Sequence, residues 1–128
     1  MSPAPDQLDS PKGRRILALA RAACAGLPEV DEVVDGFGHH TFKVRKKSFL
    51  IAGMGNDGGH VSVKADHASQ AILIARDGFE RTPYIGQHGW VSLEDPLRHD
   101  AAELAALVED AWRLAAPKSV VRGFDAAD

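Results

Sequence analysis

The sequence predicts an α+β protein in which helices pack on an antiparallel β-sheet. Three observations lead to this fold class. Apolar residues recur at helical spacing near both ends of the chain and once in its second half. Four short runs rich in Val, Ile, Phe and Thr lie between the first two helical segments. The connections between these runs are too short for the crossover helices that parallel strands need, so the sheet is expected to be antiparallel.

The first helix is expected over about 10–26, after a polar tail over residues 1–9. Ser10 can cap its N-terminus and Pro11 suits the first helical position, while Gly26 and Pro28 end the pattern. Its apolar side is formed by Ile16, Leu19, Ala20, Ala23 and Leu27. Cys24 shares this side, so we expect a buried thiol with a packing role.

The β-rich part follows this helix. We expect strands over 30–37, 41–44, 48–52 and 60–64, and a fifth over 89–93. Arg45, Lys46 and Lys47 fall at a tight connection between the second and third strands, and residues 53–59 form a longer glycine-rich loop.

Two more helices complete the predicted order α-β-β-β-β-α-β-α, with about five strands and three helices. Asp66 can cap a helix over about 67–76. Asp100 and Glu103 form a capping pair for the last helix, which Pro117 ends. The expected organisation is one domain over residues 10–118, between an N-terminal tail of residues 1–9 and a C-terminal tail of residues 119–128.

Composition fits one ordinary globular domain. The chain has 128 residues, of which 45% are apolar and 26% charged, and its formal net charge is -3. A single cysteine excludes an internal disulfide, and no apolar run approaches the roughly 20 residues that span a bilayer. The first residues lack the apolar core of a signal peptide. We therefore expect a cytoplasmic protein without a membrane partner, as a monomer or a weak dimer.

Charge is sharply sorted along one part of the chain. Residues 36–47 contain no acid and four cations, namely Lys43, Arg45, Lys46 and Lys47. The stretch just before them holds four acids, Glu29, Asp31, Glu32 and Asp35, which we expect on a solvated strand face. The basic hairpin has two interpretations. It either protects a sheet edge from aggregation or forms a protruding wing that contacts DNA phosphates, with Lys64 as a further contact.

A second unusual stretch is 84–90, where Tyr84, His88 and Trp90 lie close together beside glycines. These residues are either core aromatics with hydrogen-bonded tips or part of a pocket or stacking platform. The pocket hypothesis predicts an anionic, partly flat ligand. Its lining would be His39, Thr41, Lys47, Lys64, Tyr84, His88 and Trp90. A third hypothesis is an interaction module that uses an exposed sheet face or edge.

Sequence motifs for cofactors, metals and catalysis are weak. Residues 53–58 match G-x-G-x-x-G, but a strand-like segment follows where a dinucleotide site needs a helix. The six histidines include no pair at the i, i+4 spacing of a helical zinc site. No nucleophile motif is present. The sequence thus favours a non-enzymatic protein without metal or cofactor, although a site assembled in space from distant residues stays open.

The two unusual stretches together resemble the MmcQ/YjbR family of small bacterial proteins. The matching segments are Leu27-Pro-Glu-Val30, Phe37-Gly-His-His-Thr-Phe-Lys-Val44, Lys47-Ser-Phe49, Val61-Ser-Val-Lys64 and Tyr84-Ile-Gly-Gln-His-Gly-Trp-Val91. They occur in the family's order over about residues 10–118. Phe37 stands where the family usually has Trp, His40 where it has Pro, and Ala111-Trp112 where it has Ser-Tyr.

The resemblance implies a compact α+β fold, similar to CyaY-like or secretion-chaperone-like sheets with helices. Members are often labelled DNA-binding, by fold similarity to double-wing DNA binders. The leading hypothesis is thus a non-enzymatic DNA-binding protein that contacts phosphates through Lys43, Arg45, Lys46 and Lys47, with Lys64. Four such contacts predict a slope of log K against log salt of about -3 to -4.

Overall fold

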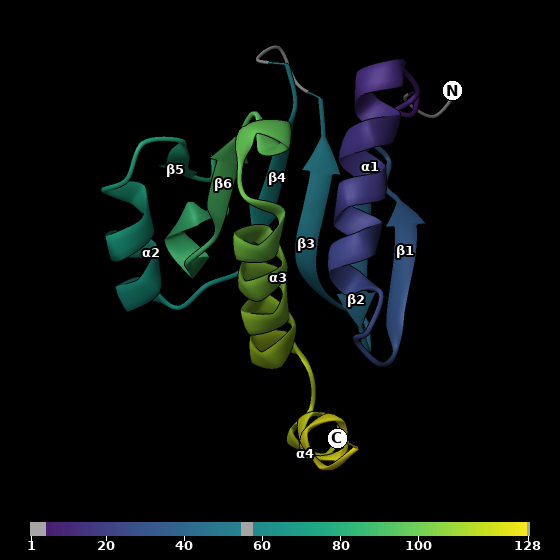
Figure 1. The fold of residues 1–128 in the computed structure, drawn as a ribbon, viewed down its shortest axis with the longest axis vertical. Helices are drawn as coiled ribbons and strands as arrows, with labels where there is room; N and C mark the ends of the chain where they lie inside the picture. Colours follow the sequence, from purple (N-terminus) through teal and green to yellow (C-terminus); the bar gives the residue numbers. More distant parts are fainter. Residues whose placement is uncertain (1–4, 55–57, 128) are drawn as a thin grey trace.

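The computed structural model describes residues 5–54 and 58–127. Over these residues the chain forms a six-stranded sheet, four α-helices and two short 3₁₀-helices (Figure 1). The elements in order are α1 (Pro11–Cys24), β1 (Val30–Val34), β2 (His40–Val44), β3 (Lys47–Gly53), β4 (His60–Val63), α2 (His67–Ile74), β5 (Phe79–Arg81), η1 (Gly86–His88), β6 (Val91–Glu94), η2 (Pro96–Arg98), α3 (Ala101–Ala115) and α4 (Lys118–Ala126). The strand order is β1-β2-β3-β4-β6-β5, and all neighbours are antiparallel.

The predicted α+β class with an antiparallel sheet is confirmed, and one strand and one α-helix were not predicted. Strand β5 is three residues long, too short for an alternating pattern to reveal it, and it pairs with β6. Helix α4 begins directly after Pro117 and covers most of residues 119–128, where a C-terminal tail was predicted. Its Val120, Val121 and Phe124 pack against the core, so residues 118–126 are helical.

The helix caps are the ones the sequence predicted. The side chains of Ser10, Asp66 and Asp100 each accept a hydrogen bond from a backbone N–H in the first turn of their helix. Glu103 does not complete the expected capping pair at α3. Its carboxylate instead accepts hydrogen bonds from Arg76, at 3.0 and 3.1 Å.

The core lies between the sheet and the helices that cover one of its faces. Trp112 of α3 is fully buried, and its indole Nε1 donates to the carbonyl oxygen of Pro28 at 3.1 Å. Cys24 is buried as expected, and burial, aided by the charge of Glu32, raises the pKa of its thiol to about 12. A thiol with this pKa stays protonated at neutral pH and packs as an apolar group.

The described part of the predicted N-terminal tail is packed against the domain. Leu8 is only 1% exposed and belongs to the core. Its backbone lies so close to Gly13 that a Cβ on Gly13 would come within 2.6 Å of it. The backbone N–H of Gln7 donates to the carbonyl oxygen of Gly38 at 2.9 Å. We call residues 5–9 the N-terminal strap, because they bind the first helix to the β1–β2 turn.

Alternation along the strands separates the two faces of the sheet. In β4, Val61 and Val63 are core residues, whereas Ser62 lies on the other face. Cross-strand register aligns Ser62 with one residue on each neighbouring strand, in the row Thr41, Ile51, Ser62, Ser92, Glu80. Directly opposed residues share a face, so this row faces away from the helices.

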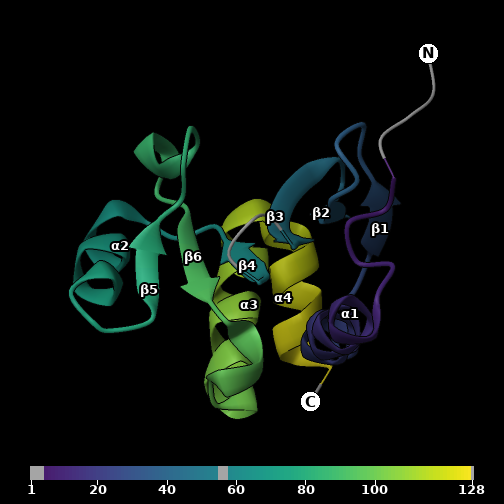
Figure 2. The same ribbon diagram turned by 90° about the horizontal axis from the view of Figure 1, so that it is seen from above.

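The helix-free face is bordered by loops. Figure 2 shows α1 and α3 on one side of the sheet, with the β5–β6 loop, which carries η1, on the other. This loop and the β1–β2 turn contribute the residues that stand around the row of aligned side chains.

The hairpin between β2 and β3 has a strained turn that yields a prediction. Arg45 and Lys46, its two turn residues, have φ of 48° and 71°. The left-handed region costs a residue with a Cβ about 1–2 kcal/mol, and glycine avoids this penalty. We expect Lys46→Gly to raise the free energy of unfolding by about 1 kcal/mol, after allowance for the greater chain entropy of glycine.

Denaturant unfolding measures this effect, with Lys47→Gly at the first residue of β3 as the matched control. The control is expected to be less stable than the wild type, because glycine weakens a strand. A loss of stability in Lys46→Gly equal to that of the control contradicts the account of the turn.

Candidate functional site

A pocket of about 600 Å³ lies on the helix-free face of the sheet, and we call it the open-face pocket. Its apolar lining comes from Phe37, Ile51, Pro83, Tyr84 and Ile85. Its polar lining comes from His39, His60, Ser62, Glu80, Thr82 and Ser92. The pocket therefore combines apolar walls with a few convergent polar groups, as small-molecule sites do.

The floor of the pocket is a chain of three hydroxyls. Ser62 Oγ lies 2.7 Å from Ser92 Oγ, which in turn lies 2.9 Å from Thr82 Oγ1. Three hydroxyl hydrogens are available and the two contacts use two of them, so one donor and several lone pairs are left over. The small serine side chains at the centre of the sheet also leave the space that the pocket occupies.

Asp35 shapes the β1–β2 turn at one wall. Its Oδ1 accepts hydrogen bonds from the backbone N–H groups of Phe37 and His39, at 2.8 and 3.0 Å. Its Oδ2 lies 3.2 Å from His39 Nδ1. Burial raises the pKa of Asp35, but these hydrogen bonds and the neighbouring His39 outweigh that effect and lower it. The ionised carboxylate thus holds both pocket residues in place.

The N-terminal strap fixes the other side of His39. Gln7 Oε1 accepts from the backbone N–H of Met54 at 3.1 Å, and Gln7 Nε2 donates to the carbonyl oxygen of Phe37 at 2.8 Å. These two bonds set the orientation of the amide, so Nε2 is also the donor in its 3.3 Å contact with His39 Nε2. His39 then donates Nδ1–H to Asp35. Both ring nitrogens are engaged, so these contacts fix the orientation of the ring at the pocket wall.

Two aromatic side chains at the pocket are largely exposed. Tyr84 is 96% exposed and Phe37 is 75% exposed, although they come from distant segments of the chain. Tyr84 has φ of 66°, and the N–H of Ile85 donates to the carbonyl of Pro83 across it at 2.7 Å. This is a tight γ-turn, which bulky residues rarely adopt.

A charge network around the buried His40 anchors the strap. His40 is 4% exposed, and its Nδ1 and Nε2 lie 2.9 Å from carboxylate oxygens of Glu32 and Asp6, respectively. Arg21 of α1 donates two hydrogen bonds of 2.7 Å to Glu32. A neutral imidazole has one N–H, so donation to both carboxylates requires the charged ring. This network joins the strap to α1, β1 and β2.

The structure brings together two of the seven residues in the sequence-predicted pocket. His39 and Tyr84 line the open-face pocket. Thr41 lies on the same face but not in the pocket lining, Trp90 is buried, and His88 is exposed in η1. Lys47 is exposed at the start of β3, and Lys64 lines a separate pocket of about 260 Å³ near α2 and α3. The lysines that suggested an anionic ligand are therefore not in the lining.

Sequence analysis missed the hydroxyl floor and most of the apolar wall. Ser62, Ser92 and Thr82 were not among the predicted site residues, because polar residues in alternating strands usually face solvent and carry no specific signal. A signal was present in the matching segments Val61-Ser-Val63 and Val91-Ser-Leu93. Each places one small hydroxyl between two core residues, and β4 and β6 are neighbours.

The charges that are sorted in sequence come together in space. Arg45 of the β2–β3 turn makes two hydrogen bonds to the carboxylate of Glu29, at 2.6 and 3.2 Å. Asp31 is the cross-strand partner of Lys43. Lys46 and Lys47 are exposed and form no ion pair with any described residue. The basic hairpin thus has fewer unmatched charges than its sequence suggests.

Not all the acids lie on the solvated face that the sequence predicted. Glu32 points to the helix side of the sheet, where Arg21 and His40 bind it, and its side chain is 25% exposed. A charged partner on α1 explains this placement, because an acid beside the core needs hydrogen bonds to offset its lost hydration.

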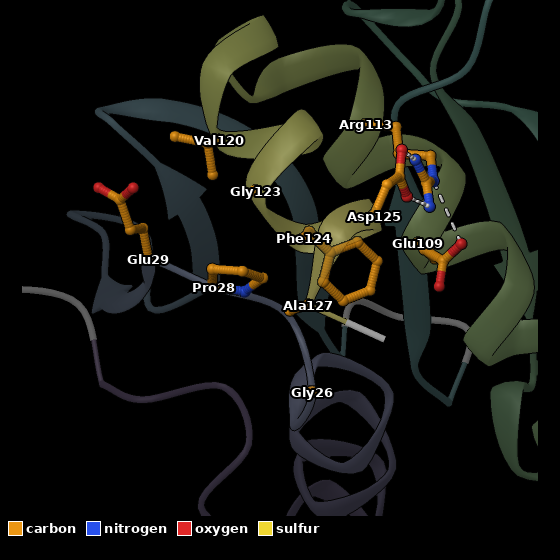
Figure 3. A pocket seen from close by; sticks show the side chains of 10 residues that line it. All are labelled: Gly26, Pro28, Glu29, Glu109, Arg113, Val120, Gly123, Phe124, Asp125 and Ala127. Atoms are coloured by element: carbon orange, nitrogen blue, oxygen red, sulfur yellow. Dashed lines mark hydrogen bonds and ion pairs between the residues drawn. The ribbon is translucent and has the colours of Figure 1, made fainter.

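A second pocket, of about 730 Å³, lies between α3, α4 and the loop before β1 (Figure 3). Arg113 is its central charge. The guanidinium binds Asp125 at 2.7 Å and Glu109 at 3.2 Å, and lies 5.4 Å from the ring centre of Phe124. The charge of Arg113 is therefore already paired with two acids of the same pocket. This pocket offers a ligand fewer unused hydrogen-bonding groups than the open-face pocket does.

The structure adds little to the cofactor, metal and membrane motifs considered in the sequence. The G-x-G-x-x-G loop includes residues 55–57, which lie outside the described residues. Over residues 5–54 and 58–127, no three His, Cys, Asp or Glu side chains are grouped as ligands for a metal ion. None of the described helices has the length and apolar character needed to cross a membrane.

The fold and the pocket define a small α+β protein whose antiparallel sheet has helices on one face and a pocket on the other. A sequence model of the YjbR family matches residues 25–114, so the chain belongs to the YjbR family. The crystal structure of Deinococcus radiodurans protein DR2400, a DUF419 protein, is similar in fold, with a TM-score of 0.65 and 20% sequence identity. The match covers 83% of this chain and 85% of that one. A comparison with curated proteins found no match.

The charge network predicts loss of stability in acid. The hydrogen bonds from Arg21 lower the pKa of Glu32, burial opposes this, and His40 lowers it further. Burial raises the pKa of Asp6, but hydrogen bonds from His40 and the Leu8 N–H outweigh it and lower the pKa. A lowered carboxyl pKa stabilises the fold above the unfolded value, 4.5 for Glu32, and this contribution is lost as the pH falls.

We therefore expect the free energy of unfolding to decrease as the pH falls from about 6 to about 3, and Glu32→Gln to show a shallower decrease. Urea unfolding at several pH values measures both curves. Asp77→Asn, at an exposed residue that forms no side-chain ion pair with a described residue, is the control and should follow the wild type. Parallel curves for Glu32→Gln and wild type contradict a role of Glu32 in acid stability.

Proposed function

We propose that this YjbR-family protein binds a small molecule in the open-face pocket and does not change it chemically. The pocket volume, about 600 Å³, lies within the roughly 300–1,000 Å³ typical of ligand sites. Its lining is mostly apolar with several convergent hydrogen-bonding groups. This combination supports a ligand with an apolar body and a polar edge.

The exposure of Tyr84 and Phe37 is the observation that carries the proposal. Exposed aromatic rings add no stability through apolar burial, since their apolar surface stays in water. A ligand that covers such a ring contributes about 1.5–3 kcal/mol through apolar burial. Two such rings at one pocket, supplied by separate loops, are readily explained by a ligand that covers both.

The hydrogen bonding of His39 supports a role in binding over a role in proton transfer. His39 has both ring nitrogens engaged, by Asp35 and Gln7, so it lacks a vacant lone pair for proton transfer. Cys24 is a buried, protonated thiol in the core and not a pocket residue. We therefore propose a non-enzymatic role that needs no cofactor.

Filling the pocket tests this proposal. Ser92→Leu places an apolar side chain on the floor, and we expect it to weaken binding of flat aromatic fragments, found by NMR screening of the wild type, at least tenfold. Ser62→Val adds less volume and should weaken binding less. Ser119→Leu, on the exposed surface of α4, is the control. Equal fragment affinity in wild type and in a folded Ser92→Leu protein contradicts the proposal.

DNA binding is a second candidate, favoured by the exposed Lys46 and Lys47 at one end of the hairpin. Because Arg45 is bound to Glu29 and Lys43 lies opposite Asp31, we expect about two phosphate contacts in place of four. The slope of log K against log salt is then about -2, and affinity is weak and non-specific.

Salt-dependent binding of duplex DNA measures this slope. The Lys46→Glu/Lys47→Glu protein should lose binding, whereas Lys118→Glu/Arg122→Glu, a matched charge change on α4, should retain it. Absence of binding at about 50 mM salt, or equal losses in the two variants, would eliminate the hairpin as a DNA contact.

A further inference from the structure

The open-face pocket lacks a strong cationic group. Among the described residues, no Lys or Arg lines it, and both ring nitrogens of His39 are engaged by Asp35 and Gln7. The lining also includes the carboxylate of Glu80. A phosphate or carboxylate inside the pocket would lose hydration without a Lys or Arg partner, which is unfavourable. The group that enters the pocket is therefore expected to be uncharged.

The hydroxyl floor favours a polar ring edge over a hydrocarbon. Ser62 and Ser92 are buried, and Thr82, at one end of the row of three hydroxyls, is half-buried. An apolar ligand over this floor would separate the remaining hydroxyl donor from water, at a cost of about 1–3 kcal/mol. A ring edge with neighbouring donor and acceptor atoms can form the hydrogen bonds that solvent would otherwise form, because the three hydroxyls can both donate and accept.

The exposed aromatic rings favour a flat ligand. Phe37 and Tyr84 are exposed aromatic residues of the pocket lining, and the stacking of a base on an aromatic side chain contributes about 1–3 kcal/mol. Tyr84 keeps its exposed ring despite a backbone conformation that glycine adopts more easily. Backbone strain at an exposed residue is typical of functional positions.

We infer that the open-face pocket takes a neutral, flat nitrogen heterocycle, the chemistry of a nucleobase. This inference rests on the proposed ligand-binding function and names its ligand class. A free nucleoside and a base of a single-stranded nucleic acid present the same ring. In either case the sugar and phosphate are expected to stay outside the pocket, because none of the described Lys and Arg residues lines it.

Calorimetric titration of the full chain tests the ligand class. The probes are the four ribonucleosides, their 5′-monophosphates, a short single-stranded oligonucleotide, and 2-naphthalenemethanol as a flat ring without nitrogen. We expect at least one nucleoside to bind tenfold or more tightly than the naphthalene probe. Its monophosphate should bind within about threefold of the nucleoside, since the phosphate gains no partner.

The outcomes separate this inference from the proposed function. Equal or tighter binding of the naphthalene probe overturns the nucleobase class and leaves small-molecule binding intact. A monophosphate that binds more than tenfold tighter than its nucleoside overturns the neutral pocket. If no flat ring binds, including the oligonucleotide, the inference and the proposed function both fail. Binding of the oligonucleotide alone, if lost on filling the floor with Ser92→Leu, supports the inference and identifies a polymer as the source of the ring.

Tyr84→Gly separates stacking from folding. The substitution removes the exposed ring and relieves the positive φ, so we expect nucleoside affinity to fall at least fivefold while the melting temperature is unchanged or higher. Ile72→Ala, at a residue that is 69% exposed on α2 and outside the pocket, should change neither. Unchanged affinity in Tyr84→Gly, or a fall in melting temperature that accounts for lost binding, contradicts a stacking role.

Discussion

The structure depends on the one-sided covering of its sheet. Helices α1 and α3 pack on one face, and the strands alternate, so each strand places core residues on that face and others on the opposite one. Across β3, β4, β6 and β5, register then aligns Ile51, Ser62, Ser92 and Glu80 on the helix-free face. Small hydroxyl residues in the middle of this row leave a hollow, and the two flanking loops deepen it into a pocket. The pocket is thus a consequence of strand register.

The same antiparallel pairing brings together the opposite charges that are separated in the sequence. An acidic segment followed by a basic one becomes, after pairing of β1 with β2, a surface where Asp31 lies opposite Lys43 and Glu29 binds Arg45. Glu32 turns inward to Arg21 and His40. This inner network anchors the N-terminal strap, and Gln7 of the strap orients His39 at the pocket wall. The sorted charges therefore support the fold and the pocket wall, whereas Lys46 and Lys47 are exposed and form no ion pair with the described residues.

Sequence analysis predicted the elements that have strong local signals. Ser10, Asp66 and Asp100 cap their helices because short polar side chains satisfy the first N–H groups, and this effect depends on local sequence. Strand β5 is too short for a periodic signal, and α4 followed a proline that was interpreted as the end of structure. In the site, Tyr84 and His39 could be predicted from unusual local composition. The hydroxyl chain could not, because contact of Ser62 with Ser92 depends on β4 pairing with β6, which are separated by a helix and another strand.

The central claim is that the helix-free face, and not the basic hairpin, is the main binding surface. Amide chemical-shift mapping of the wild-type protein with the flat heteroaromatic probe that binds most tightly tests this claim directly. The account predicts the largest shifts at Phe37, Ser62, Tyr84 and Ser92, with small changes at Arg45 and Lys46. Shifts confined to the β2–β3 hairpin, or to the pocket around Arg113, would contradict it.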